Sequence, residues 1–344
     1  MYNRVVITGS AGLIGSHLAT RFLSLGYEVL GIDNLVGGYS SNIPNNKKYT
    51  HANIDITDSK RVKTVISSFD PSIVIHCAAL AHEGLSVFSP STITNNIYSG
   101  TISIASAAIA SGAKLFINAS SMASYGDVGA PFSEHTKPSP VDPYGLAKLQ
   151  AEQQLNLLAK IHSIKVVHMV PHNVCGPNQC YSDPFRNVLS IFANRISKDK
   201  PVYIYGDGLQ KRSFSHVEDC VDAYIKVVEL HNQINSGEVF NIGPTHGSEI
   251  TITELADKVA KHYNKVSDKI YIDARPQEVK NAWVSTEKAE LRLDYKTKFD
   301  VEDVVRDTVT WIKSSPNREF NYHIDLEIIN DKTPITWKEK LFND

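Results

Sequence analysis

The sequence is poor in cysteine and contains no long apolar run. Its 344 residues include four cysteines, and no two of them form a Cys-x-x-Cys pair, so neither a disulfide framework nor a zinc motif is indicated. No stretch of about 18 apolar residues occurs, and no apolar leader precedes the first predicted strand. We therefore expect a cytoplasmic protein with free thiols, no membrane span and no bound metal.

The chain also lacks an excess of charge of either sign. It has 35 Lys and Arg residues against 37 Asp and Glu residues, a formal net charge of −2. This balance gives no overall attraction to nucleic acid or acidic lipid, so we expect neither as a partner. Hydrophobic residues make up 42% of the chain, as in ordinary globular proteins, and the length favours two lobes.

Short β-branched runs alternate with amphipathic helical stretches through the first half of the chain. Buried strands separated by helices predict an α/β fold with a Rossmann-like, doubly wound parallel sheet. The predicted strands are Val5–Ile7, Glu28–Ile32, Ile73–Ile75, Leu115–Ile117 and Lys165–Val170. The predicted helices are Gly12–Leu25, Arg61–Ser68, Asn95–Ser111 and Tyr144–His162.

The alternation ends near Pro171. Short predicted helices, Asn187–Ser197 and Ile252–Tyr263, are then mixed with loops rich in Gly, Pro and Asp. We predict a larger lobe formed by residues 1–170, with a return segment at about 217–243. A smaller α/β lobe would comprise residues 171–216 and 244–344, whose polar end, residues 321–344, carries no motif.

Three glycines lie between the first predicted strand and the first helix. Gly9, Gly12 and Gly15 have the spacing G-x-x-G-x-x-G, which allows a tight turn and brings a phosphate close to the helix N-terminus. Alone, this triplet equally fits an ordinary strand-to-helix turn. Asp33, 18 residues after Gly15, ends the second strand, where a carboxylate binds ribose hydroxyls and repels a 2′-phosphate. The combination predicts NAD rather than NADP.

Other residues of the same sheet edge are expected to contact this cofactor. His76, which precedes the small residues after the third strand, is by itself better explained as a core histidine. Asp55 and Ile56 are expected to end a further strand, although Asp55 by itself is better explained as a turn residue. The cofactor set that we predict is Gly9, Gly12, Leu13, Ile14, Gly15, Asp33, Asn34, Asp55, Ile56, Ala78, Ala79, Asn96, Tyr144, Lys148 and Pro171.

Tyr144 and Lys148 lie four residues apart on a predicted helix, and therefore share one face. A nearby ammonium favours the phenolate, so we expect Lys148 to lower the pKa of Tyr144 and make it a usable general base. The alternative is a solvated helix face. Asp142 and Pro143 are typical of an N-cap and a first-turn proline.

A serine-rich segment follows the fourth strand at the same sheet edge. Ser121 could donate a hydrogen bond to a substrate hydroxyl, although an ordinary serine-rich loop also fits the pattern. The neighbouring Met122 and Ala123 cannot transfer protons.

Together these motifs resemble those of the extended short-chain dehydrogenases, specifically the nucleotide-sugar epimerase/dehydratase family. The resemblance covers roughly residues 3 to 313, with the motifs in the family's order. They are Thr8–Gly15, Asp55-Ile56, His76–Ala79, Ser120–Gly126, Tyr144–Lys148, Pro171–Pro177 and Tyr205–Phe214. Val170, Cys175 and Ala81 depart from residues that are common in the family, namely Arg, Tyr and Lys.

The resemblance implies a lobe for NAD and a lobe for a nucleoside diphosphate sugar. It implies that Tyr144 is the base, Lys148 its modulator and ribose ligand, and Ser121 the hydroxyl partner. The implied substrate contacts are Ser121, Met122, Asn173, Asn187, Val188, Tyr205, Arg212, Arg275, Glu278 and Ala282. Ala282 would lie beside the 2-substituent of the sugar, where a small residue admits an N-acetyl group.

The segment after Ser121 also selects among the family's reactions. Dehydratases of the family carry Asp and Glu where this chain has Met122 and Ala123, so elimination lacks its acid and base. We therefore predict a UDP-sugar 4-epimerase, with glucose, N-acetylglucosamine and glucuronate types all open. Two rivals are a nucleotide-sugar dehydrogenase or ketoreductase and a non-catalytic dinucleotide-binding regulator.

The resemblance further implies a homodimer. Residues 95–111 and 144–162 resemble helices that form a four-helix interface in the family. The small residues Ala105, Ala108 and Ser111 would allow close approach of the helices.

Overall fold

A computed structural model describes residues 3–244 and 247–344. The two predicted lobes contain four residues, at positions 1, 2, 245 and 246, that lie outside the described residues. Within the described ranges, no helix is long and apolar enough to cross a membrane.

A seven-stranded parallel sheet forms the centre of the larger lobe, which confirms the predicted α/β class. Its strand order is β11-β6-β5-β4-β1-β2-β3, so the direction of winding reverses between β1 and β4. The strands are β1 (Arg4–Thr8), β2 (Glu28–Ile32), β3 (Tyr49–Ala52), β4 (Ile73–His76), β5 (Leu115–Ala119), β6 (Lys165–Pro171) and β11 (Glu238–Ile242). Ligands bind at the carboxyl ends of the strands next to such a reversal.

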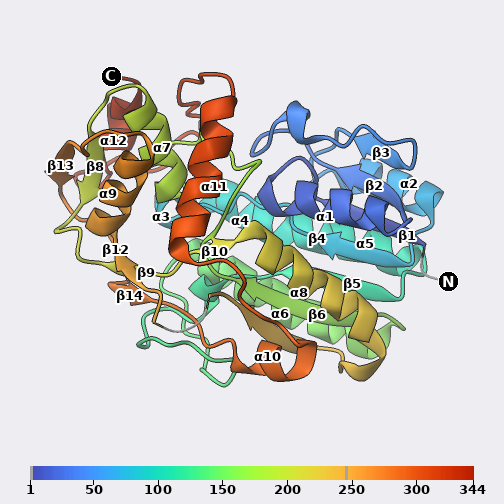
Figure 1. Cartoon of the computed structure of the whole chain (residues 1–344). Helices are drawn as coiled ribbons and strands as arrows, with labels where there is room; N and C mark the ends of the chain where they lie inside the picture. The colour runs from blue at the N-terminus through green and yellow to red at the C-terminus, as the bar shows by residue number, and fades with distance from the viewer. Residues whose placement is uncertain (1–2, 245–246) are drawn as a thin grey trace.

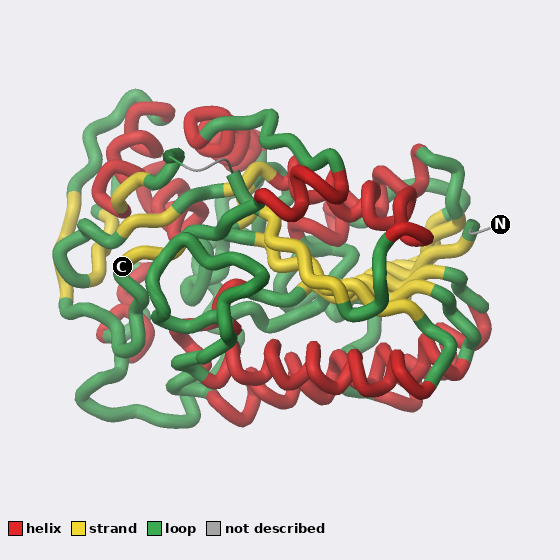
Figure 2. Tube along the Cα trace, turned by 90° about the horizontal axis from the view of Figure 1, so that it is seen from below, coloured by secondary structure: helices red, strands yellow, loops and turns green. Residues whose placement is uncertain are grey.

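Helices cover both faces of this sheet (Figure 2). Apolar side chains of α1 (Leu13–Ser24) and α8 (Val217–Leu230) pack on one face. Those of α2 (Ser59–Phe69), α5 (Gly100–Ala110) and α6 (Pro143–Ile161) pack on the other. The strands between the two edges of the sheet are largely buried, which explains their nearly continuous apolar sequence.

Two expected elements differ in detail. The predicted helix 95–111 is a longer helical run that begins with α4 (Pro90–Thr94), passes through a π-helical turn at Asn95–Ser99 and continues as α5. Asp55 was expected to end a strand, but β3 ends at Ala52, and Asp55 lies in the following loop. There its carboxylate accepts hydrogen bonds from Thr57 and Asn34.

The second group of elements lies at the end of the sheet opposite the N-terminus (Figure 1). Its strands are short, and its helices pack around a separate apolar cluster. They are β7 (Val174–Cys175), α7 (Val188–Ser197), β8 (Val202–Tyr205), β9 (Lys211–Arg212), β10 (Ser215–His216), β12 (Ile250–Thr251), α9 (Ile252–His262), β13 (Lys269–Ile272), β14 (Asn281–Ala282) and α11 (Val301–Ser314). Helix α10 (Glu287–Leu293) instead packs beside α8.

Residues 315–344, here called the C-terminal strap, join these two groups of elements. The strap contains α12 (Ile335–Lys338). Its Asn321 amide donates to the Ser182 carbonyl at 2.8 Å, before α7, and its Glu327 amide donates to the Phe88 carbonyl at 2.9 Å, after β4. The strap therefore crosses from one lobe to the other.

Candidate active site

A cavity of about 690 Å³ lies beyond the carboxyl ends of β1, β2, β4, β5 and β6. Every residue that the sequence predicts for the site lines this cavity, except Ala282. The parallel sheet explains this convergence, because each of these strands delivers its last residues to the same edge.

The glycine turn approaches neighbouring backbone too closely for any side chain. A Cβ atom on Gly15 would lie 2.1 Å from the Gly9 carbonyl oxygen, and one on Gly9 would lie 2.8 Å from the Ala78 amide nitrogen. Gly9 also has a positive φ of 71°. Helix α1 begins immediately afterwards, has no acidic residue in its first turn, and is capped by none of the described side chains. Its N-terminus is therefore suited to a phosphate group.

Asp33 is held in place by the same turn. One carboxylate oxygen accepts from the Ala11 amide at 2.9 Å, and the other accepts from the Leu35 amide at 2.7 Å. The side chain is 7% exposed and faces the cavity beside Gly12. Because a carboxylate has spare lone pairs, it can still accept from a ribose hydroxyl.

The loop after β4 is fixed by a residue of the π-helical turn. The Asn96 amide oxygen accepts from the Leu80 backbone amide at 2.8 Å. This bond places Ala78 and Ala79 along the cavity wall, where their small side chains leave room for a planar group.

Tyr144 and Lys148 project from the first turns of α6 into the cavity. Asp142 caps this helix by accepting from the Gly145 amide at 2.8 Å, and Pro143 occupies the first turn, as predicted. The Lys148 ammonium lies 5.9 Å from the centre of the Tyr144 ring and donates to the Ala119 carbonyl at 2.7 Å.

Burial controls the proton affinities of both groups. It raises the pKa of Tyr144 to about 12, although a hydrogen bond with Ser121 and the charge of Arg186 act in the opposite direction. It lowers the pKa of Lys148 to about 8. The expected lowering of the Tyr144 pKa is therefore wrong for this structure, because loss of hydration outweighs the neighbouring charges.

Ser121 follows β5 and faces Tyr144. Its hydroxyl also accepts from the Ala123 amide at 3.2 Å, which starts a 3₁₀ turn. The Met122 sulfur contacts the His172 ring and lines the cavity. No acid or base stands at position 122 or 123.

Two arginines and a glutamate form the opposite end of the cavity. The Arg275 guanidinium donates to the Glu278 carboxylate at 3.0 and 3.2 Å and lies 4.7 Å from the centre of the Tyr205 ring. Arg212 approaches Glu278 to 3.8 Å. Burial favours the protonated form of Glu278, but its pKa is lowered overall because the ion pair with Arg275 prevails.

Two asparagines of the predicted set use their side chains for local structure. Asn173 donates to the Ser213 carbonyl at 3.0 Å. Asn187 caps α7 by accepting from the Ser190 amide at 3.4 Å, and Val188 is the first residue of that helix. Both asparagines have positive φ and still border the cavity.

Ala282 does not lie where the sequence predicts. It is 1% exposed and belongs to β14, which pairs with β9 so that Ala282 stands opposite Arg212. Its side chain packs in an apolar cluster with Tyr125, Phe132 and Val170. Ala282 is therefore not among the residues that line the cavity, although its strand partner Arg212 is.

Several cavity residues had no motif in the sequence to mark them. The loop after β4 adds His82 and Glu83, and the segment before α7 adds Asp183 and Arg186. The strap adds His323, Ile324, Asp325, Trp337 and Phe342. Glu83 is the most perturbed of the acids: burial, with repulsion from Asp142, raises its pKa to about 7.

The fold and the site define a class of protein, a dinucleotide-binding α/β protein with a buried Ser-Tyr-Lys group beside the cofactor cradle. The model of the "NAD dependent epimerase/dehydratase family" matches residues 5–243. The chain belongs to that family, which confirms the resemblance drawn from its motifs and makes it an NAD-dependent enzyme.

The chain is similar to known UDP-sugar epimerases over nearly the whole length of those proteins. A putative UDP-glucose 4-epimerase of Methanocaldococcus jannaschii is 31% identical, and the match covers 90% of this chain and 99% of the relative. The UDP-glucose 4-epimerase of Thermus thermophilus, solved with NAD, has a TM-score of 0.83 at 28% identity, covering 91% of this chain and 100% of that one. The UDP-glucuronic acid 4-epimerase of Bacillus cereus, solved with UDP-glucuronic acid and NAD, has a TM-score of 0.82 at 27% identity, covering 90% and 99%.

Proposed function

We propose that this chain interconverts the C4 epimers of a UDP-sugar with NAD as a resident cofactor. The observation that carries the proposal is the meeting of Ser121, Tyr144 and Lys148 with the glycine turn in one cavity, without an acid or base at Met122 and Ala123. Elimination needs such groups, whereas oxidation and reduction at carbon 4 need only the phenol and the cofactor. The relatives' activities on UDP-sugars support the same assignment.

The cavity fits NAD at its glycine end. The uncapped N-terminus of α1, reached through the glycine turn, suits a pyrophosphate. Asp33 suits ribose hydroxyls and repels a 2′-phosphate. We assign the rest of this end to the cofactor as well, with Asn34, Asp55, Ile56, Ala78, Ala79, Asn96 and Pro171 along its length. When bound, NAD supplies the acceptor and donor of hydride.

The opposite end of the cavity suits the nucleoside diphosphate. Arg212 and Arg275 present guanidinium groups that can bind phosphate oxygens in pairs, and Glu278 can accept from a ribose hydroxyl. We assign Asn173, Asn187, Val188 and Tyr205, which line the same cavity, to the nucleotide sugar as well. A sugar attached to the diphosphate would then reach Tyr144.

In this arrangement Tyr144 takes the proton of the 4-hydroxyl group and Ser121 holds the same oxygen by a hydrogen bond. Lys148 keeps positive charge near the phenol and is available to a ribose hydroxyl. Because both epimers must present carbon 4 to one phenol, the sugar has to reorient while the arginines keep the diphosphate bound.

The proposal includes the larger setting of the site. We assign residues 1–170 and 217–243 to the NAD lobe, and residues 171–216 and 244–344 to the nucleotide-sugar lobe. A homodimer forms through the helical run 95–110 and α6. The four free cysteines support a cytoplasmic location.

The test is incubation of the purified protein with UDP-glucose, UDP-N-acetylglucosamine and UDP-glucuronate, followed by NMR of the products. Inversion at carbon 4 of at least one sugar, without added NAD, is expected. Net oxidation that requires added NAD would instead identify a dehydrogenase. Failure to convert any of the sugars, with NAD bound, would favour the non-catalytic alternative.

A further inference from the structure

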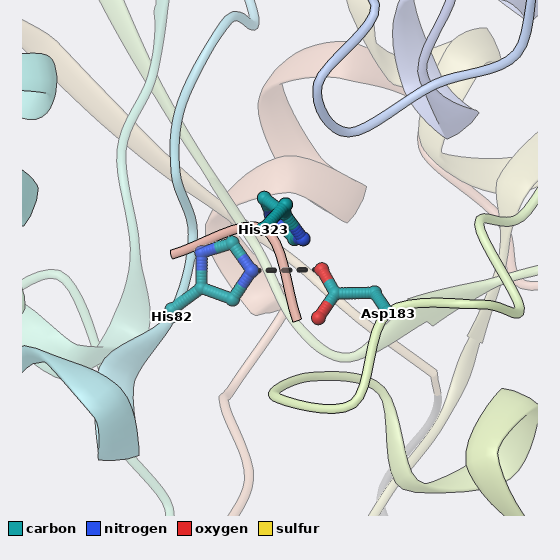
Figure 3. A group of neighbouring side chains, drawn as sticks. All are labelled: His82, Asp183 and His323. Carbon is teal, nitrogen blue, oxygen red and sulfur yellow. Dashed lines mark hydrogen bonds and ion pairs between the residues drawn. The ribbon is translucent and has the colours of Figure 1, made fainter. Parts of the chain in front are cut away.

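Two histidines and an aspartate, His82, Asp183 and His323, meet at the wall of the cavity (Figure 3). They come from the loop after β4, the segment before α7 and the C-terminal strap. One donor atom from each lies within 4.8 Å of the donor atoms of the other two. His82 and Asp183 are each 2% exposed. Neither the proposed binding of cofactor nor that of nucleotide sugar uses this cluster.

His323 directs an unshared electron pair into the cluster. Its Nδ1 atom lies 3.0 Å from the Asn321 carbonyl oxygen, which can only accept, so Nδ1 carries the hydrogen. The other nitrogen, Nε2, is therefore an acceptor. It is buried and has no hydrogen-bond partner among the described residues. A ring held in this way, with its second nitrogen free, has the arrangement of a metal-ligating histidine.

Asp183 and His82 supply the other two donors. The Asp183 Oδ1 atom accepts from the Phe185 amide at 2.8 Å, which fixes the carboxylate and turns Oδ2 toward His82. The His82 Nε2 atom lies 2.7 Å from Oδ2. No lysine or arginine forms an ion pair with Asp183 in the described part of the chain. The carboxylate charge is therefore available to a cation.

We propose that His82, Asp183 and His323 bind a divalent transition-metal ion of the zinc type. Two imidazoles and one carboxylate suit zinc, and also cobalt or nickel, better than calcium or magnesium, which take oxygen ligands. Ligands of a tetrahedral zinc ion lie about 3.4 Å apart. Binding therefore requires the His82–Asp183 pair to open slightly and the His323 ring to approach.

Proton balance is met within the cluster. The His82 hydrogen shared with Asp183 leaves Nε2 when the ion binds, and can move to Nδ1, which is buried and has no partner among the residues that the structure describes. The ion then carries one carboxylate and two neutral rings, with a further position open to the cavity. Since His323 belongs to the strap and the other two ligands do not, the ion would also fix the strap across both lobes.

The experiment uses the whole protein after dialysis against a chelator, with no nucleotide sugar present. Equilibrium dialysis with Zn²⁺ and visible absorption with Co²⁺ are expected to show one ion per chain. His323→Gln should weaken Zn²⁺ binding at least about 100-fold, because loss of a ligand exceeds the effect of losing a ligand's own partner. Zn²⁺ should raise the Tm of the wild type but not that of this variant.

His162→Gln, which changes an exposed histidine on the far end of α6, is the matched control and should bind as the wild type does. Wild-type protein that retains no ion, or retains it equally after His323→Gln, overturns the proposal. A rise in KM for UDP-sugar in His323→Gln, with no metal in the wild type, would make the cluster a substrate contact instead.

Discussion

At the scale of single residues, Tyr144 is the proposed base, yet its buried site disfavours the phenolate. Burial raises its pKa to about 12, which opposes formation of the phenolate that a general base requires. Ser121 and Arg186 both stabilise the anionic form. Proton transfer at this residue therefore depends on groups assembled from three separate segments of the chain.

Tyr144→Phe removes the base and leaves the fold and the glycine turn unchanged. Turnover of the UDP-sugar should fall by at least about 100-fold, the usual contribution of a general base. Binding of NAD, measured by calorimetry, should change little. Tyr125→Phe is the control, because this buried tyrosine bonds Asn241 and does not line the cavity. Near-normal turnover in a folded Tyr144→Phe protein would refute the assignment.

Glu83 should make the stability of the protein depend on pH. Its pKa is 4.5 when unfolded and about 7 when folded, because burial disfavours the carboxylate. The native state therefore holds this proton more tightly, and stability falls as pH rises from about 4.5 to about 7. Glu83→Gln, which cannot ionise, should lose this part of the dependence and melt a few degrees higher than the wild type at pH 8.

The difference between the two proteins is measured as the Tm of ligand-free protein at pH values from 4.5, the pKa of the unfolded carboxyl group, up to about 8. Glu339→Gln in the exposed end of the strap serves as the control. If the Tm of the wild type and the Tm of Glu83→Gln depend on pH in the same way, folding does not raise the pKa of Glu83.

At the scale of elements, the C-terminal strap is held by an unusual buried charge. Arg195 of α7 is 2% exposed, and its guanidinium donates to the carbonyls of Leu341 and Phe342 at 3.0 and 2.8 Å. The Phe342 ring also packs against Tyr203 and Phe320. The last residues of the strap thus accept two hydrogen bonds from a buried cation whose Nε atom donates to the Pro201 carbonyl at 2.6 Å.

Phe342→Ala should destabilise the protein by about 3 to 5 kcal/mol, as expected for a truncated buried aromatic side chain. The variant should also raise KM for the UDP-sugar, since Phe342 lines the cavity. Urea unfolding and steady-state kinetics measure the two effects. Ile335→Ala in the same strap, at a side chain that is 51% exposed, should do neither. Equal stability of Phe342→Ala and wild type would mean that the strap end is not anchored as described.

The strap also shows which parts of the site local sequence can predict. Gly9, Asp33 and Ser121 each follow a strand, and a parallel sheet brings strand ends together, so their convergence follows from pattern alone. His323 and Trp337 line the same cavity but belong to the strap, whose sequence has no helical or strand periodicity. The strap is positioned by contacts with residues far away in the sequence, such as Phe88 and Ser182. Ala282, which the sequence places at the cavity, is buried in a two-residue strand, and counting along the chain does not give the burial of such a residue.

At the scale of the whole molecule, the predicted dimer needs a different set of contacts from the one first expected. Ala105 and Ala108 are 1% and 0% exposed and pack against α2 within the chain, so they cannot form an interface. The exposed positions of the same helical run are Asn95, Ser99, Ser106 and Ala110. On α6, Leu146, Gln150, Gln153 and Leu157 form an exposed stripe.

The α6 stripe has the three- and four-residue spacing with which helices pack side by side. Leu146 is 46% exposed and Leu157 is 59% exposed. Two copies related by a twofold axis could cover these leucines with the small residues of the partner, forming a four-helix contact. Burial of apolar side chains would then drive association.

Leu157→Glu should convert the dimer to a monomer, because it places a charge where apolar surface would be buried. Light scattering at micromolar concentration should give twice the chain mass of 38.1 kDa for the wild type and the single mass for the variant. Leu209→Glu, at an equally exposed leucine of the second lobe, should leave the dimer intact. A monomeric wild type, or a dimer unaffected by Leu157→Glu, would place the subunit contact elsewhere or exclude it.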